Sequence, residues 1–471
     1  MKQHDLALKA VPWLQVGILS APQVRFCFSG AYTWEGTQYE GDQEAVCSDG
    51  QITFAGRRYA SLTFQPVDEK ATFVIEEVTI GVQFHWQRKE QQRFAGGLRL
   101  VVDPASKGSQ LVVINEIDVE RYLTSVISSE MSATASKALL KAHAVISRSW
   151  VLAQIGPSTS RSEQGPHDPL SDTSSSGKQS SSSGKQSSSS DVMQERENLR
   201  IRWYDHDDHT LFDVCADDHC QRYQGVTRAS TPIVEEAVQE TAGEVLLYAG
   251  TLCDTRFSKC CGGVTEQFES CWEPVPHPYL RAVRDGAETA FPDLTQEKEA
   301  DRWIRQTPAA YCHTRDAAIL RQVLNSYDQE TTDFYRWQVQ YTQEELSELI
   351  ARKSGFHVGQ VVDLVPIERG PSGRIVRLEI RGTARNVVIG KELEIRRTLS
   401  ETHLYSSAFV VEKGAVCQGI PASFRLIGAG WGHGVGLCQI GAAVMGAQGF
   451  DYRQILMHYY PGATLQRYDE P

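Results

Sequence analysis

A carboxylate on an apolar helical stripe is the first candidate for chemistry. Glu130 follows Val126 by four residues and Leu123 by seven, so a helix over 119–131 would place it on their face. Partial burial disfavours the charged form of a carboxylate and raises its pKa. A general acid that works near neutral pH needs that state. The alternative is that Glu130, close to the end of the helix, turns its side chain into solvent.

Thiols and imidazoles within a short segment are the second candidate. Two cysteines and up to two histidines within twelve residues suit a tetrahedral zinc ion. The ligands would be His209, Cys215, His219 and Cys220, with His206 and Asp213 in reserve. A Cys215–Cys220 disulfide or two free thiols are the alternatives. A catalytic zinc needs an open coordination position, and without one the ion would be structural.

The chain has eleven cysteines in all, and an odd number leaves at least one unpaired. Cys253, Cys260, Cys261 and Cys271 form a second group. Disulfides among them would suit an oxidising compartment, and four cysteines allow three connectivities. A second metal site there is less favoured, because Cys260 and Cys261 are adjacent and no histidine lies between the four.

Residues 428–441 form a glycine-rich loop, and five glycines over 428–436 alternate with other residues, including Trp431 and His433. Glycine loses more backbone entropy on folding than any other residue. This density therefore predicts a loop that needs unusual dihedral angles or the close approach of another group. His433 and Gln439 are the side chains in this loop that could hydrogen-bond a ligand, although both could equally stabilise the loop itself.

The elements around these residues suggest an α+β fold. Short strands dominate residues 1–110, and a helical hairpin follows, with Asp118 as the expected N-cap of its first helix. Residues 111–465 form the main domain, which includes a small β-unit over 361–389. A Gly/Ser repeat at about 157–192 cannot bury a core and is expected to be a disordered insertion.

Composition limits the class of protein. The net charge of −12 argues against nonspecific nucleic-acid binding, which needs a basic surface. No apolar run is long enough to span a bilayer, and the first residues lack the apolar region of a secretory signal. Either the protein is cytoplasmic or a native signal is missing from this sequence.

Several motifs occur together in the order found in one family. Residues 120–131 read ERYLTSVISSEM, residues 138–148 read ALLKAHAVISR, residues 430–442 read GWGHGVGLCQIGA and residues 455–462 read ILMHYYPG. Together with Gly262–Glu266 and Gly373-Arg374, they resemble the signature of the stage II sporulation protein D/LytB family over about residues 112–465. The chain departs from that signature at His143, where the family usually has Gln, and at Leu437-Cys438, where it has Met-Ser.

The resemblance implies a peptidoglycan lytic transglycosylase that cleaves between N-acetylmuramic acid and N-acetylglucosamine, preferably in strands stripped of stem peptides. It maps the family's catalytic carboxylate onto Glu130. The segment from His209 to Cys220 resembles the zinc-binding segment of some members. The alternative is a LytB-type module that enhances a cell-wall amidase without cutting glycan. Either activity implies an envelope or periplasmic location, although no signal is visible.

Further residues are candidates for contact with a glycan. Arg148 on the second helix would bind sugar or pair with a carboxylate. Tyr122 and Trp431 could stack on sugar rings, as could Trp272 and Tyr459, although aromatic residues at such spacing more often belong to a core.

Overall fold

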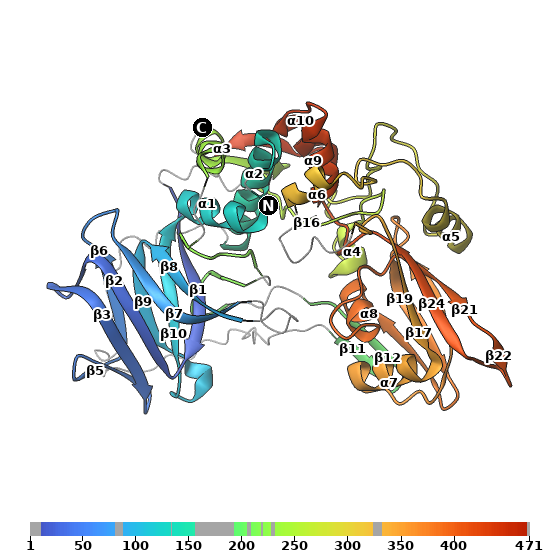
Figure 1. Ribbon diagram of the computed structural model, residues 1–471, viewed down its shortest axis with the longest axis horizontal. Helices are drawn as coiled ribbons and strands as arrows, with labels where there is room; N and C mark the ends of the chain where they lie inside the picture. The colour runs from blue at the N-terminus through green and yellow to red at the C-terminus, as the bar shows by residue number, and fades with distance from the viewer. Residues whose placement is uncertain are drawn as a thin grey trace, which may run out of the picture.

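A computed structural model of the chain shows how these elements are arranged (Figure 1). It describes residues 11–80, 88–132, 134–155, 193–204, 209–217, 220–227, 231–323 and 332–468. The insertion expected at 157–192, His206 and His219 lie outside the described residues. Helices and mainly antiparallel sheets combine in the chain, so the predicted α+β class is confirmed.

The first lobe is one large sheet, drawn in blue shades in Figure 1. Its central path runs β13-β1-β10-β9-β6-β2-β3-β4-β5, and β7 joins β2 and β8. The strands are β1 (Trp13–Ala21), β2 (Gln23–Trp34), β3 (Thr37–Ser48), β4 (Gln51–Phe54), β5 (Arg57–Tyr59), β6 (Ser61–Pro66), β7 (Thr72–Ile80), β8 (Arg88–Ala95), β9 (Gly97–Val102), β10 (Leu111–Asp118) and β13 (Val214–Cys215), with a 3-10 turn at Pro104–Ser106.

The strand β10 ties the N-terminal region to the main domain. It lies between β1 and β9 in the sheet and leads directly into the helical hairpin. The boundary expected at residues 110 and 111 therefore runs through one sheet. The N-terminal strands extend the main domain at this edge.

A helical layer lies above the two lobes in Figure 1. It contains α1 (Val119–Glu130), α2 (Lys137–Ile155), α3 (Pro232–Glu240), α6 (Ala317–Val323), α9 (Gln439–Ala447) and α10 (Tyr452–Tyr459). Small sheets accompany it, made by β14 (Glu244–Tyr248) with β15 (Thr251–Leu252) and β26 (Thr464–Arg467), and by β16 (Phe257–Ser258) with β25 (Leu437–Cys438).

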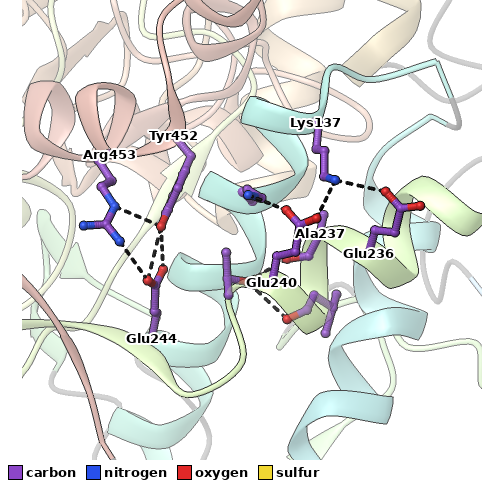
Figure 2. Close-up of polar contacts among 10 residues, drawn as sticks. Lys137, Glu236, Ala237, Glu240, Glu244, Tyr452 and Arg453 are labelled. Carbon is purple, nitrogen blue, oxygen red and sulfur yellow. Dashed lines mark hydrogen bonds and ion pairs between the residues drawn. The ribbon is translucent and has the colours of Figure 1, made fainter. Parts of the chain in front are cut away.

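Polar contacts join these helices at the surface (Figure 2). Lys137 on α2 pairs with Glu236 at 2.9 Å and Glu240 at 2.6 Å, both on α3. On the other side, the Tyr452 hydroxyl donates to Glu244 at 3.0 Å. Because exposed ion pairs are worth about 1 kcal/mol or less, packing between the helices holds the layer together.

The described residues of the second lobe form three further sheets. Their strand orders are β11-β12-β20-β19-β18, β17-β24-β21 and β22-β23. The elements are β11 (Met193–Arg196), β12 (Leu199–Arg202), β17 (Arg336–Thr342), β18 (Val361–Arg369), β19 (Ile375–Gly382), β20 (Asn386–Gly390), β21 (Phe409–Lys413), β22 (Val416–Cys417), β23 (Ile420–Pro421), β24 (Ser423–Ala429), α4 (Phe268–Cys271), α5 (Glu297–Gln306), α7 (Gln343–Ser354) and α8 (Glu392–Thr398). The β-unit expected over 361–389 corresponds to β18, β19 and β20. Within the described ranges, no helix is long and apolar enough to cross a membrane.

Candidate functional site

The helix α1 has the cap and the apolar stripe that its sequence predicts. The Asp118 carboxylate accepts a hydrogen bond from the Arg121 backbone N–H at 3.0 Å, which caps the first turn. The stripe residues Val119, Leu123, Val126 and Ile127 are fully buried. Glu130 is the last residue of the helix and is partly buried. Its position at the end of a buried stripe is that expected of a carboxylate at the edge of a core.

Arg148 is held by a buried ion pair. Its Nε and Nη2 atoms donate to the two carboxylate oxygens of Glu120 at 2.9 and 2.6 Å, and Nη1 donates to the Glu244 carbonyl at 3.1 Å. The Arg148 side chain is completely inaccessible to solvent. Because its donors are used inside the protein, the geometry favours the carboxylate pair over a contact with sugar. The pair fixes α2 against α1.

Tyr122 lies in the core next to both candidate centres. It is fully buried and stacks on Tyr223 at a ring separation of 5.2 Å, so the structure favours the core alternative for this residue. Burial raises its pKa well above the usual value. The Tyr122 hydroxyl donates to Gln221 Oε1 at 3.4 Å, next to Cys220 in the chain, and Glu130 lies on the same helix as Tyr122.

His209, Cys215 and Cys220 form what we call the outer cluster, and all three are partly buried. Their ligand atoms lie within 4.8 Å of one another, and Cys220 Sγ is 3.5 Å from His209 Nε2. A tetrahedral zinc ion with ordinary bond lengths places sulfur and nitrogen ligands about 3.6 Å apart. The three described residues therefore fit zinc, with the fourth expected ligand, His219, outside the described residues.

The glycine loop has the unusual dihedral angles that its composition predicts. Gly430, Gly432, Gly434 and Gly436 all have positive φ, from 71° to 93°. The group that approaches the loop is the guanidinium of Arg374, which is 1% exposed. Its Nη2 donates to the Gly432 carbonyl at 3.0 Å, and a Cβ on Gly434 would lie 2.4 Å from its Cζ. Glycine is needed here because the backbone wraps a buried arginine.

The polar residues of the loop point in different directions. Gln439 is buried and contacts His143 of α2, with 3.2 Å between Nε2 atoms. His433 accepts the Val435 backbone N–H on Nδ1 at 3.0 Å and packs against Trp272 at a ring separation of 4.9 Å. Gln439 thus connects the loop to the helical hairpin, whereas His433 packs around Trp272.

Trp431 in the loop and the nearby Trp272 both pack against other side chains of the protein. The Trp431 ring stacks on Phe334 at 4.6 Å, and the Arg256 guanidinium lies 4.6 Å from the Trp272 ring centre. Both tryptophans are only partly buried.

Burial, with nearby positive charges such as Arg256, lowers the pKa of His433 well below its usual value, so this imidazole is neutral near pH 7.

Sequence reasoning gave no role to Glu266 and Arg374, although both lie in segments that match the family signature. The Glu266 carboxylate is fully buried and accepts hydrogen bonds from the Ser270 hydroxyl at 2.9 Å and the Ser372 hydroxyl at 2.6 Å. Arg374 Nη1 donates to the same Ser372 hydroxyl at 3.0 Å. A charged residue within three positions after a glycine, in a segment that matches the family signature, was the available signal for this buried polar network.

Cys253, Cys260, Cys261 and Cys271 form no disulfide in this structure, so the bridges considered for the second cysteine group are absent. Instead, Cys261 meets two cysteines from distant parts of the chain and a buried aspartate. We call Cys261, Asp285, Cys312 and Cys438 the inner cluster. Sequence reasoning missed this set because its members are spread over 177 residue positions.

Comparisons with known proteins agree with the motifs. Residues 107–248 match the family described as stage II sporulation protein, and residues 266–436 match a domain of unknown function. A stage II sporulation protein D of Bacillus amyloliquefaciens is 23% identical over 357 residues, 76% of this chain and 76% of that protein. The amidase enhancer of Bacillus subtilis (strain 168) is 23% identical over 256 residues, 50% of this chain and 32% of that protein.

An uncharacterized protein of Brachyspira hyodysenteriae is 24% identical over 360 residues, which is 76% of this chain and 69% of that protein. The matched segments include α1, α2 and the segment that carries the outer cluster. Residues 107–248 therefore carry a stage II sporulation protein domain, and proteins named stage II sporulation protein D and amidase enhancer are similar to the chain.

Proposed function

We propose that the protein is a lytic transglycosylase of peptidoglycan and that Glu130 is its general acid and base. The observation that carries the proposal is the place of Glu130, partly buried at the end of the apolar stripe of α1. The substrate would be glycan strands of the cell wall, and the protein would act in the cell envelope. The family resemblance of residues 120–131 supports the same residue.

In the proposed reaction, Glu130 protonates the glycosidic oxygen as the bond from C1 of N-acetylmuramic acid breaks. The resulting carboxylate then accepts the proton of the muramoyl 6-hydroxyl, whose oxygen attacks C1. A 1,6-anhydro ring forms and the proton balance of Glu130 is restored. Because the nucleophile belongs to the substrate, one carboxylate is sufficient, whereas glycoside hydrolases use two.

The outer cluster would stabilise the segments around α1, the helix that carries Glu130. His209, Cys215 and Cys220 would hold a zinc ion, which would supply a fixed positive charge and a cross-link between the chain segments around α1. The buried pair of Arg148 and Glu120 would keep α1 and α2 in register. Both features would position Glu130 without touching the substrate.

The experiment is digestion of denuded glycan strands by the purified full chain, with detection of 1,6-anhydro products. Glu130→Gln is expected to lower the rate by about 10²-fold or more, which is typical for loss of a general acid. Glu236→Gln is the matched control, because Glu236 is an exposed helix carboxylate that pairs with Lys137 (Figure 2). Full activity of a folded Glu130→Gln variant would exclude the proposed role.

The second candidate is a noncatalytic enhancer of a cell-wall amidase. It is favoured by the similarity to a protein named amidase enhancer. In this case the chain alone releases no anhydro product, and it accelerates an N-acetylmuramoyl-L-alanine amidase on intact peptidoglycan. Glu130→Gln would keep that acceleration, so the same pair of variants distinguishes the two candidates.

A further inference from the structure

The inner cluster gathers soft ligands in a closed interior. Three Sγ atoms and one carboxylate oxygen, from Cys261, Cys312, Cys438 and Asp285, lie within 4.8 Å of one another. Each of the four residues is at most 2% exposed. Burying a carboxylate among thiols is costly unless it is paired, hydrogen-bonded or bound to a metal.

The spacing of the thiols fits ligands of one ion. Cys261 Sγ and Cys312 Sγ are 3.7 Å apart. A disulfide would bring them to about 2.05 Å. Two thiolates at 2.3 Å from a tetrahedral zinc ion are separated by about 3.8 Å. The measured distance therefore matches the edge of a zinc tetrahedron.

Backbone donors surround the sulfur atoms. The Cys261 N–H donates to Cys438 Sγ at 3.2 Å, and the Gly263 N–H donates to Cys261 Sγ at 3.4 Å. Cys438 is also the N-cap residue of α9, whose first turn carries partial positive charge. Such donors stabilise thiolate sulfur, which is the form that binds metal.

The carboxylate of the cluster is oriented by a second layer of contacts. The Tyr459 hydroxyl donates to Asp285 Oδ1 at 2.7 Å, and the Cys312 N–H donates to Oδ2 at 2.8 Å. Gly441 of α9 leaves room for this arrangement, because a Cβ there would lie 2.5 Å from Oδ1 and 2.3 Å from the Tyr459 oxygen. Outer contacts of this kind are typical of metal ligands.

We propose that the inner cluster is a structural zinc site with Cys261, Cys312, Cys438 and Asp285 as its ligands. Three thiolates favour zinc over the harder divalent cations, and four protein ligands close the coordination sphere. The ion would offset part of the ligand charge. The site would fasten the glycine loop and α9 to the segments after β16. It is separate from the outer cluster and independent of the proposed function.

The test is zinc content of the full chain, purified under reducing conditions without chelator. Zinc is measured in the wild type, in an outer-cluster variant, Cys215→Ser/Cys220→Ser, and in an inner-cluster variant, Cys312→Ser/Cys438→Ser. The outer-cluster variant is expected to keep about one zinc ion per chain, and the inner-cluster variant to lose about one relative to the wild type. Cys253→Ser, which changes a fully buried cysteine outside both clusters, should keep the wild-type content.

Cobalt substitution gives a second readout. The outer-cluster variant reconstituted with Co²⁺ should show thiolate-to-cobalt charge transfer and the d–d bands of a tetrahedral site. An outer-cluster variant without zinc, a Cys261–Cys312 disulfide in the purified chain, or iron with acid-labile sulfide in place of zinc would each overturn the proposal. The outer-cluster variant leaves all four inner ligands intact, so it decides the question even where the inner-cluster variant fails to fold.

Discussion

The outer and inner clusters are two groups of metal-type ligands that the chain assembles in different ways. The outer cluster takes its three described ligands from a segment of twelve residues, and each ligand is partly buried. The inner cluster joins Cys261 to Cys312 and Cys438, which lie 51 and 177 positions away, and all of its members are buried. A local segment forms the first, whereas only the folded domain forms the second.

Because the two clusters lie in different parts of the fold, we expect them to have different roles. The outer cluster is connected to α1, the helix that carries Glu130, because the Tyr122 hydroxyl donates to Gln221 next to Cys220. The inner cluster includes Cys438, the N-cap residue of α9, and the next residue, Gln439, contacts His143 of α2. We therefore expect changes to the inner cluster to affect mainly stability and changes to the outer cluster to affect mainly the site.

The largest expected effect is on the free energy of unfolding after loss of the inner carboxylate. Asp285→Ala removes the acceptor of the Tyr459 hydroxyl and of the Cys312 N–H, and it removes a proposed zinc ligand. Breaking such a buried network costs about 3–5 kcal/mol. Urea unfolding monitored by circular dichroism measures this loss.

The matched change at the other cluster is His209→Ala. Because His209 is partly exposed, we expect a loss of about 1 kcal/mol, comparable to one surface hydrogen bond. Equal losses in the two variants would remove the distinction between a structural inner cluster and an outer cluster that serves the site.

The second-largest expected effect is a loss of thermal stability when a side chain is added beside the inner cluster. Gly441→Ala would force a Cβ against the Tyr459 oxygen and the Asp285 carboxylate, which hold one another in place. Overpacking of this kind costs about 1–3 kcal/mol, so we expect the thermal midpoint to fall by several degrees.

Gly446→Ala is the control on the same helix. Its Cβ would meet the Ser136 hydroxyl, a rotatable group, at 2.5 Å, and alanine improves helix propensity by up to about 1 kcal/mol. We expect this variant to be close to the wild type. A larger loss for Gly446→Ala than for Gly441→Ala would show that crowding at the inner cluster is not the cause.

A third effect is the rate of metal release to a chelator. Ligands that are partly exposed can exchange in the native state, whereas buried ligands need local unfolding. We expect release from the inner cluster to be at least about tenfold slower, equivalent to about 1.4 kcal/mol in the barrier. A colorimetric zinc indicator would record two phases in the wild type. The Cys215→Ser/Cys220→Ser variant should lack the fast phase, and loss of the slow phase in that variant would reverse the assignment.

Local patterns in the sequence predict much of the molecule. The capped helix α1, its buried stripe and the strands of residues 361–389 follow from spacing of apolar residues and from Asp118 at the cap. The outer cluster was recognisable because its ligands are neighbours in the chain. The glycine loop was predicted to need unusual dihedral angles or the close approach of another group, and the structure has both.

Tertiary contacts decide what local patterns leave open. The close neighbour of the glycine loop is Arg374, and nothing in the spacing of the glycines identifies a partner from the turn between β18 and β19. For Arg148 the sequence left two partners open, and the position of the partly buried Glu120 on α1 selects the ion pair. The inner cluster depends on four distant segments, so it becomes visible only when the fold is known.

The smallest expected effect is the pH dependence of stability that comes from the contact between His143 on α2 and Gln439 at the start of α9. His143 on α2 contacts Gln439, and its Nδ1 has no hydrogen-bond partner within the described residues. Burial, with a contribution from Lys259, lowers its pKa from 6.5 to about 3. The unfolded chain therefore binds the proton more tightly than the folded chain, and stability present above pH 6.5 is lost as the pH falls towards 3.

Between pH 7 and pH 5.5 this difference amounts to about 1 kcal/mol. His143→Gln carries an amide that does not titrate, and it introduces the residue usual at this position in the family signature. We expect the unfolding free energies of the wild type and His143→Gln to diverge by this amount as the pH is lowered, because other titrating groups are common to both and cancel. Parallel pH profiles in urea unfolding would mean that the imidazole becomes protonated without breaking its contact with Gln439. In that case the contact between α2 and the start of α9 would tolerate a charged imidazole, and these two helices would be held together less tightly than the burial of His143 implies.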